Sequence, residues 1–96
     1  MGYSLIITNK AESDVDEATA YYFNIRKNLA KKFITELKTT VKYIQKNPDK
    51  IQIRYGNIRI AFLKAFPFGI HYTVASGTII ILAVFHTARD NEKWTQ

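Results

Sequence analysis

The chain contains no cysteine among its 96 residues. It can therefore form no disulfide, no thiolate metal site and no cysteine nucleophile, and this composition suits a reducing compartment. No run of about 20 apolar residues is present, which excludes a transmembrane helix. The N-terminus has no basic segment ahead of an apolar one, which argues against a signal peptide. We expect a single cytoplasmic domain over residues 1–96, with no membrane partner.

Recognisable catalytic motifs are also missing. The sequence has no glycine-rich phosphate loop, no Gly-x-Ser-x-Gly elbow and no His-Glu-x-x-His pair. Its two histidines, His71 and His86, do not have a metal-ligand spacing, so we expect neither a metal nor another cofactor. Strand alternation places His71 on the sheet face opposite Ile70 and Tyr72, where we expect a surface or rim residue.

Acidic residues are few: eight Asp and Glu stand against 14 Lys and Arg, for a formal net charge of +6. The imbalance is concentrated in residues 25–64, which carry eleven basic and two acidic side chains, whereas residues 1–24 have a net charge of −3. A basic central block favours an acidic partner, either nucleic acid or an acidic protein. A solvated, lysine-rich helix face is an equally weighted alternative.

Apolar periodicity predicts two helices after a short first strand. Residues 3–8 form a β-type run, and Asn9 is the predicted N-cap of the first helix, with Glu12 completing a capping box. Apolar residues then recur every three or four positions, the pattern restarts near Asn28, and Pro48 ends the second helix. The tight connection predicts an antiparallel helical hairpin.

Four further strands are predicted, over residues 51–55, 58–66, 68–75 and 78–85. Gly56-Asn57 and Ser76-Gly77 supply the turns. The last run is apolar at nearly every position, which predicts a central strand buried on both faces. The predicted fold is α+β, in the order β-α-α-β-β-β-β, with helices over one face of a mainly antiparallel sheet.

Side chains that could bind phosphate or move a proton lie at the strand margins. Arg59 on a half-buried face needs a carboxylate, a backbone carbonyl or a ligand phosphate as its partner. His86 ends the last strand, where it is either a general acid or base or a hydrogen-bonding group at the strand end. Arg89 either binds a ligand or pairs locally with Asp90, and Trp94 is expected to pack back onto the sheet.

An arginine-bearing strand leads into a Phe-Pro-Phe turn, and the last strand ends in histidine shortly before Arg-Asp and a tryptophan. Together with the order of the elements, these features resemble the RelE/ParE toxin superfamily over residues 3–94. The resemblance implies the toxin of a bacterial type II toxin–antitoxin pair, also called a plasmid-stabilisation protein, that a cognate antitoxin neutralises. The basic block suits an acidic antitoxin segment, and the predicted partner-binding residues are Lys31, Lys38, Lys42 and Trp94.

The resemblance implies one of two mechanisms. ParE-like members inhibit DNA gyrase, and the long helical hairpin and the C-terminal tail favour this side. RelE-like members cleave mRNA on the translating ribosome without a metal; that mechanism would make Arg59, His86 and Arg89 catalytic and would use Arg54, Arg59 and Lys64 to bind phosphate. A non-catalytic RNA-binding module is a third hypothesis, so enzymatic activity stays open. Free strand edges predict a homodimer or a toxin–antitoxin hetero-oligomer.

Overall fold

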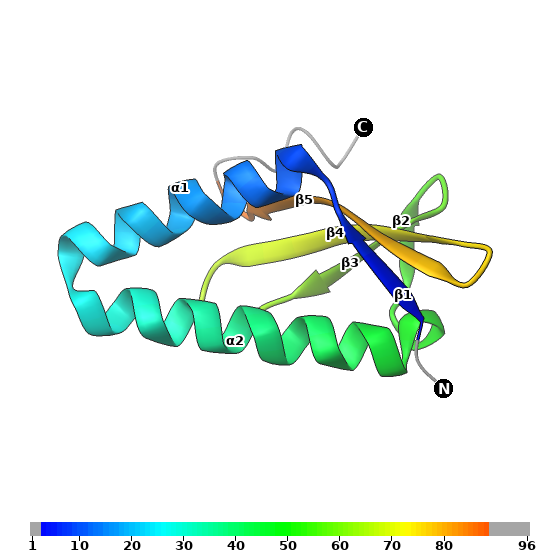
Figure 1. Cartoon of the computed structure of the whole chain (residues 1–96), viewed down its shortest axis with the longest axis horizontal. Coiled ribbons are helices and arrows are strands. Elements are labelled where there is room, and N and C mark those ends of the chain that lie inside the picture. Colours follow the sequence, from blue (N-terminus) through cyan, green and yellow to red (C-terminus); the bar gives the residue numbers. More distant parts are fainter. Residues whose placement is uncertain (1–2, 89–96) are drawn as a thin grey trace.

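The computed structural model describes residues 3–88, and Figure 1 shows how their helices and strands are arranged. Strand β1 (Ser4–Ile7) leads into helix α1 (Asn9–Ile25), and helix α2 (Lys27–Lys46) returns beside it as an antiparallel hairpin. A short 3-10 turn, η1 (Pro48–Lys50), precedes β2 (Ile53–Tyr55), β3 (Ile58–Phe62), β4 (Phe68–Ala75) and β5 (Thr78–His86). The predicted α+β order is confirmed.

The five strands form one sheet in the order β1-β5-β4-β3-β2, in which β1 pairs with β5 in parallel and the other pairs are antiparallel. Strand β5 therefore lies inside the sheet, as its apolar run predicts. The expectation that it is buried on both faces is met only in part: Ile79, Ile81 and the adjacent pair Ala83 and Val84 are buried, whereas Ile80 and Leu82 are only partly covered. The helices pack against one face of the sheet, so burial alternates from residue to residue over the first part of β5, up to Ala83.

The first helix begins with Thr8 as its N-cap rather than Asn9. The Thr8 hydroxyl accepts a hydrogen bond from the Ala11 amide at 3.1 Å and donates one to the Leu82 carbonyl at 3.1 Å. The Thr8 amide also continues the parallel pairing with β5, donating to Ile81 at 3.1 Å. Thr8 thus ends the strand and caps the helix at once, because an N-cap residue keeps an extended backbone.

Two strands are shorter than predicted, since backbone amides and carbonyls near their ends bond outside the sheet. Strand β2 begins at Ile53 rather than at 51, and β3 ends at Phe62 rather than at 66. After β3, the amides of Lys64 and Ala65 donate to the carboxylate of Glu36 on α2. Backbone groups that are satisfied by a side chain in this way are not available for a β ladder.

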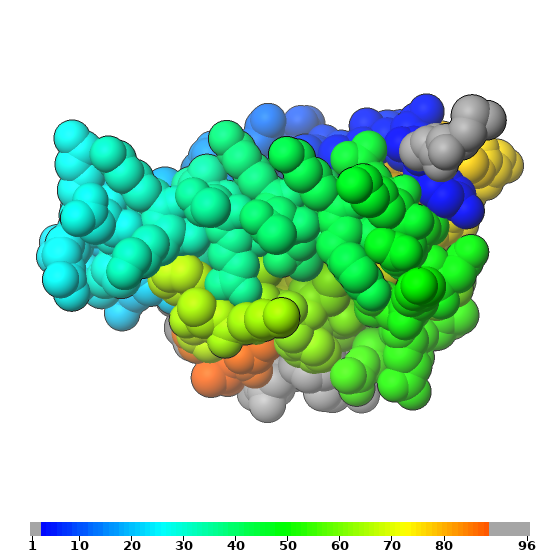
Figure 2. Space-filling model, turned by 90° about the horizontal axis from the view of Figure 1, so that it is seen from below, coloured from blue at the N-terminus to red at the C-terminus, as the bar shows by residue number. Residues whose placement is uncertain are grey.

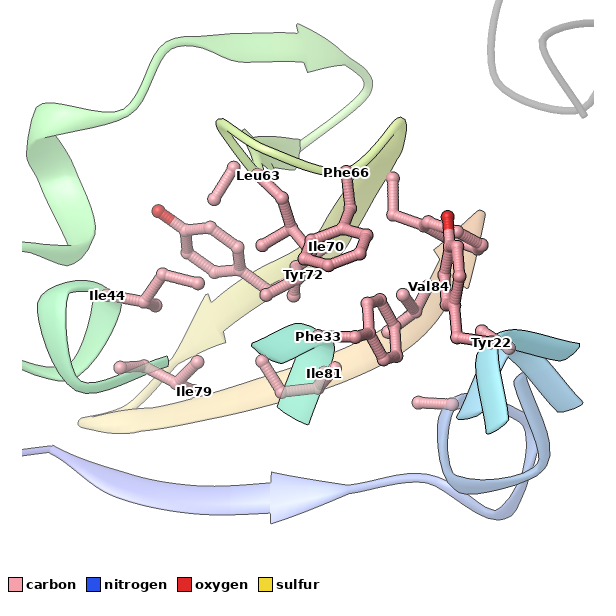
Figure 3. Close-up of a cluster of buried hydrophobic side chains, with 14 of the residues drawn as sticks. Tyr22, Phe33, Ile44, Leu63, Phe66, Ile70, Tyr72, Ile79, Ile81 and Val84 are labelled. Atoms are coloured by element: carbon pink, nitrogen blue, oxygen red, sulfur yellow. The ribbon is translucent and has the colours of Figure 1, made fainter. Parts of the chain in front are cut away.

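An aromatic cluster joins the helices to the sheet (Figure 3). The ring centroid of Phe33, which is fully buried, lies 5.4 Å from those of Tyr22 and Phe66 and 5.3 Å from that of Phe68. These separations are typical of attractive edge-to-face and tilted ring pairs. Tyr22 and Phe33 lie on the apolar stripes of α1 and α2, and both are buried in this cluster.

Candidate functional site

Arg59 is held by the segment that connects α2 to the sheet. Its guanidinium donates to the Ile51 carbonyl at 2.5 Å and lies 3.6 Å from the Asp49 carboxylate. Its side chain is 18% exposed, whereas that of Asp49 is 74% exposed. Of the three partners that the sequence allowed, Arg59 has a carbonyl and a carboxylate within its own chain.

Tyr72 anchors the same segment from the neighbouring strand. Arg59 and Tyr72 are directly paired across β3 and β4, and the Tyr72 hydroxyl donates to the Pro48 carbonyl at 2.8 Å. Burial raises the pKa of Tyr72 to about 12, although the nearby positive charge of Arg59 acts in the opposite direction. The phenol is therefore a permanent donor, and the two side chains together clamp η1 onto the sheet.

His86 lies at the end of β5 against an aromatic neighbour. It pairs across the sheet with Phe68, and the centroids of the two rings are 5.1 Å apart at a steep interplanar angle of 79°. Its Nδ1 accepts a hydrogen bond from the Ala88 amide at 3.1 Å. This contact corresponds to the strand-end hydrogen-bonding alternative that the sequence left open.

The structure does not bring Arg59 and His86 together. Arg59 pairs with Tyr72 and His86 pairs with Phe68, so the two pairings lie four residues apart along β4. That interval corresponds to about 13 Å along the strand, and β4 itself separates the two partner strands. Arg59 is held by Ile51 and Asp49, and His86 Nδ1 by the Ala88 amide, so the two side chains do not converge on one phosphate-sized site.

His71 is buried, and the prediction of a surface or rim position is wrong. It lies on the predicted face, opposite Tyr72, but it is only 1% exposed because large neighbours flank it. Tyr55 Oη and His71 Nδ1 are 3.1 Å apart in a hydrogen bond, and the Phe85 ring centroid lies 4.8 Å away. Burial lowers the pKa of His71 to about 4; Asp14 acts against this shift and Lys10 adds to it. The imidazole is accordingly neutral at physiological pH.

Arg54 and Lys64 were predicted to bind phosphate beside Arg59, and both are exposed. The Arg54 guanidinium lies 5.3 Å from the ring centroid of Phe62, within the range of a cation–π contact. Lys64 follows β3, in the loop that Glu36 ties to α2, and Figure 2 shows this loop (yellow-green) packed against the helix. Sequence reasoning missed Glu36, although it is one of only two acidic residues in the basic block.

The three predicted partner-binding lysines of α2 lie on one side of the helical hairpin. Lys31 lines a hollow of about 420 Å³ near the α1–α2 connection, and Lys38 and Lys42 line a second hollow of about 420 Å³ nearer to β1. Ile34 lines both hollows, so the two lie next to each other along α2. The structure therefore places Lys31, Lys38 and Lys42 on one side of α2, and their role in binding a partner stays a prediction.

Arg89 and Trp94 lie outside the described residues. Among residues 3–88, no three side chains of the His, Cys, Asp and Glu types gather as they would around a metal ion. Neither α1 nor α2 has the combination of length and apolar character needed to cross a bilayer.

Comparisons with known proteins agree on one family. Residues 5–91 match the family model described as "ParE toxin of type II toxin-antitoxin system, parDE". A solved structure titled "Chromosomal ParDE TA system from P. aeruginosa" is similar with a TM-score of 0.77 and 25% sequence identity, over 88% of this chain and 95% of that chain. No curated protein matches the sequence.

Proposed function

The chain belongs to the ParE toxin family of type II toxin–antitoxin systems, and from this premise we propose that it inhibits DNA gyrase in the bacterial cytoplasm and is neutralised by a cognate antitoxin. In this role the protein acts by binding its target and needs no cofactor. The family assignment supports the toxin role, and the geometry of the described polar residues favours binding over RNA cleavage.

The contacts of Arg59 within its own chain are the observation that most favours gyrase binding over RNA cleavage. A metal-independent ribonuclease needs cations on the scissile phosphate and a nearby group for proton transfer. Arg59 is instead bonded to Ile51 and Asp49, and His86 lies at a distant position on the sheet. His71, the other histidine, is buried and kept neutral. The described residues thus resemble a scaffold more than a reaction centre.

A supercoiling assay with purified components tests the proposal. The toxin should prevent gyrase from supercoiling a relaxed plasmid, and prior addition of the antitoxin should restore the reaction. A cell-free translation reaction, sampled in parallel, should retain intact mRNA. Normal supercoiling together with cut mRNA would instead establish the ribosome-dependent nuclease. Normal supercoiling together with intact mRNA would favour a non-catalytic binding module.

A further inference from the structure

The two edge strands of the sheet, β1 and β2, differ in their protection against pairing with another strand. Strand β2 is three residues long, carries Arg54 and has an irregular register against β3. Charge and irregular register are features by which proteins keep an edge strand from pairing. Strand β1 has neither: its sequence is Ser-Leu-Ile-Ile, and it pairs with β5 in a regular register. Within residues 3–88 no strand lies beyond it.

The backbone groups of Leu5 and Ile7 form the free edge of β1. The amides of Ser4 and Thr8 each donate a hydrogen bond of 3.1 Å on the β5 side. Because successive backbone groups alternate in direction along a strand, the amides and carbonyls of Leu5 and Ile7 point away from β5. This edge therefore offers two donors and two acceptors to a further strand.

The side chains along this edge are apolar on both faces of the sheet. Ile7 pairs with the buried Ile81 on the helix face, whereas Ile6 lies on the opposite face beside Ile80. Ile6 and Ile7 are each 51% exposed. A further strand would remove apolar surface from water on both faces while it satisfies the free backbone groups.

The spacing of Leu5 and Ile7 makes the edge complementary to itself. When two β1 strands pair in antiparallel orientation about a twofold axis at Ile6, Leu5 of each copy lies opposite Ile7 of the other. These residues then exchange hydrogen bonds across the axis. Ile6 faces Ile6 of the second copy in a close pair without hydrogen bonds, with Cα atoms about 4.5 Å apart. Both copies thus use the same patch, as a twofold interface requires.

The helix ends beside β1 carry opposite charges. At the N-terminal end of β1, Gln45 of α2 donates to the Tyr3 carbonyl at 3.2 Å, and the last turn of α2 carries the exposed Lys46. At the C-terminal end of β1, α1 begins with the exposed Glu12 in its first turn. Figure 1 shows β1 running from the end of α2 to the start of α1. An antiparallel pair therefore brings the basic α2 end of each copy beside the acidic α1 start of the other, which is complementary.

We propose that two copies of this chain pair through β1 and join their sheets into one, as a symmetric dimer. The inference concerns the chain alone, so it holds or fails independently of gyrase inhibition. Because only two residues of each copy supply backbone groups, the dimer should be reversible and dependent on concentration.

Sedimentation equilibrium of the purified protein tests the dimer. The mass should rise with concentration from that of one chain toward that of two. Ile6→Lys should weaken dimerisation at least about tenfold, since like charges would then face each other across the axis. The control Ile53→Lys makes the same change at a position of β2 that is 47% exposed, and it should dimerise like the parent. Circular dichroism of both variants confirms folding.

Disulfide trapping tests the register, because the parent chain has no cysteine. Under mild oxidation the Ile6→Cys variant should form a covalent dimer, since Cα atoms about 4.5 Å apart fit a disulfide. In the same register, position 4 of one copy lies four residues along the strand from position 4 of the other, or about 13 Å. The control Ser4→Cys, on the same strand and face, should therefore stay monomeric on a non-reducing gel.

Hydrogen exchange distinguishes a second copy from the antitoxin as the occupant of the edge. The amides of Leu5 and Ile7 should exchange more slowly as the concentration of the toxin alone is raised. Slower exchange that requires the antitoxin would assign the edge to the antitoxin and overturn the inference. A parent that is monomeric at every concentration, equal losses for the two lysine variants, or equal trapping at positions 4 and 6 would overturn it as well.

Discussion

Replacing Arg59 with alanine distinguishes a structural from a catalytic role. A structural role predicts lower stability with retained toxicity, whereas a catalytic role predicts unchanged stability with lost toxicity. The substitution removes a charged hydrogen bond to the Ile51 carbonyl, a contact of a type worth about 1.5–3 kcal/mol. It also removes the ion pair with Asp49, whose exposed carboxylate adds less than about 1 kcal/mol. The Tyr72–Pro48 hydrogen bond remains in place. We therefore expect a loss of about 2 kcal/mol in the free energy of unfolding.

Thermal unfolding followed by circular dichroism measures this loss, which for a domain of this size corresponds to a fall in Tm of about 10 °C. Below the transition, the variant should still inhibit gyrase as strongly per folded molecule as the parent. Asp49→Ala should lower the stability by less than about 1 kcal/mol, because only the exposed ion pair is lost. Unchanged stability of Arg59→Ala, accompanied by loss of toxicity, would refute the structural reading and restore Arg59 as a catalytic candidate.

Three further substitutions test the fold. Thr8→Ala should lower the free energy of unfolding by about 1 kcal/mol, because it removes the N-cap of α1. Thr8→Ser should keep most of that stability, and the midpoints of urea denaturation measure both effects. Phe33→Ala should cost about 3–5 kcal/mol through lost packing and a cavity, with a smaller loss for Phe33→Leu by the same assay. The unfolded chain protonates His71 near pH 6.5, at about its reference pKa, whereas the folded chain does so at about 4. Its contribution to stability is therefore complete above about pH 6.5 and is lost as the pH falls to about 4. His71→Gln should remove that part of the pH dependence, and an identical slope in parent and variant would contradict the buried, neutral imidazole.

Much of the fold could be predicted because the main signals are local. The apolar stripes that include Tyr22 and Phe33 require two helices with a buried side, and the Ser76-Gly77 turn fixes the last hairpin. The continuous apolar run of the last strand placed it inside the sheet. The unequal burial of the β5 residues could not be predicted from this apolar run, because the run does not show that the helices cover only one face of the sheet.

The candidate site was harder to predict, since it depends on contacts between distant segments. The partners of Arg59 lie eight and ten residues away, in an irregular connection that no periodic pattern describes. His71 was misplaced for a related reason: alternation gives the face of a residue but not the size of the side chains beside it. Tyr55, 16 positions earlier in the chain, and Phe85 on the next strand determine its burial.

The two acidic residues of the basic block explain why its charge remains available to a partner. Glu36 binds the backbone amides that follow β3, and Asp49 pairs with Arg59 beside η1. Both are thus engaged in fixing loops, and within residues 3–88 neither neutralises Lys31, Lys38 or Lys42. Because like charges along one helix face repel each other, a partner that supplies acidic groups relieves an existing cost as well as making new contacts. Lys38 and Lys42 line a hollow together with Val15, Leu37 and Val41, and this position supports the proposal of a partner contact over the alternative of a solvated helix face.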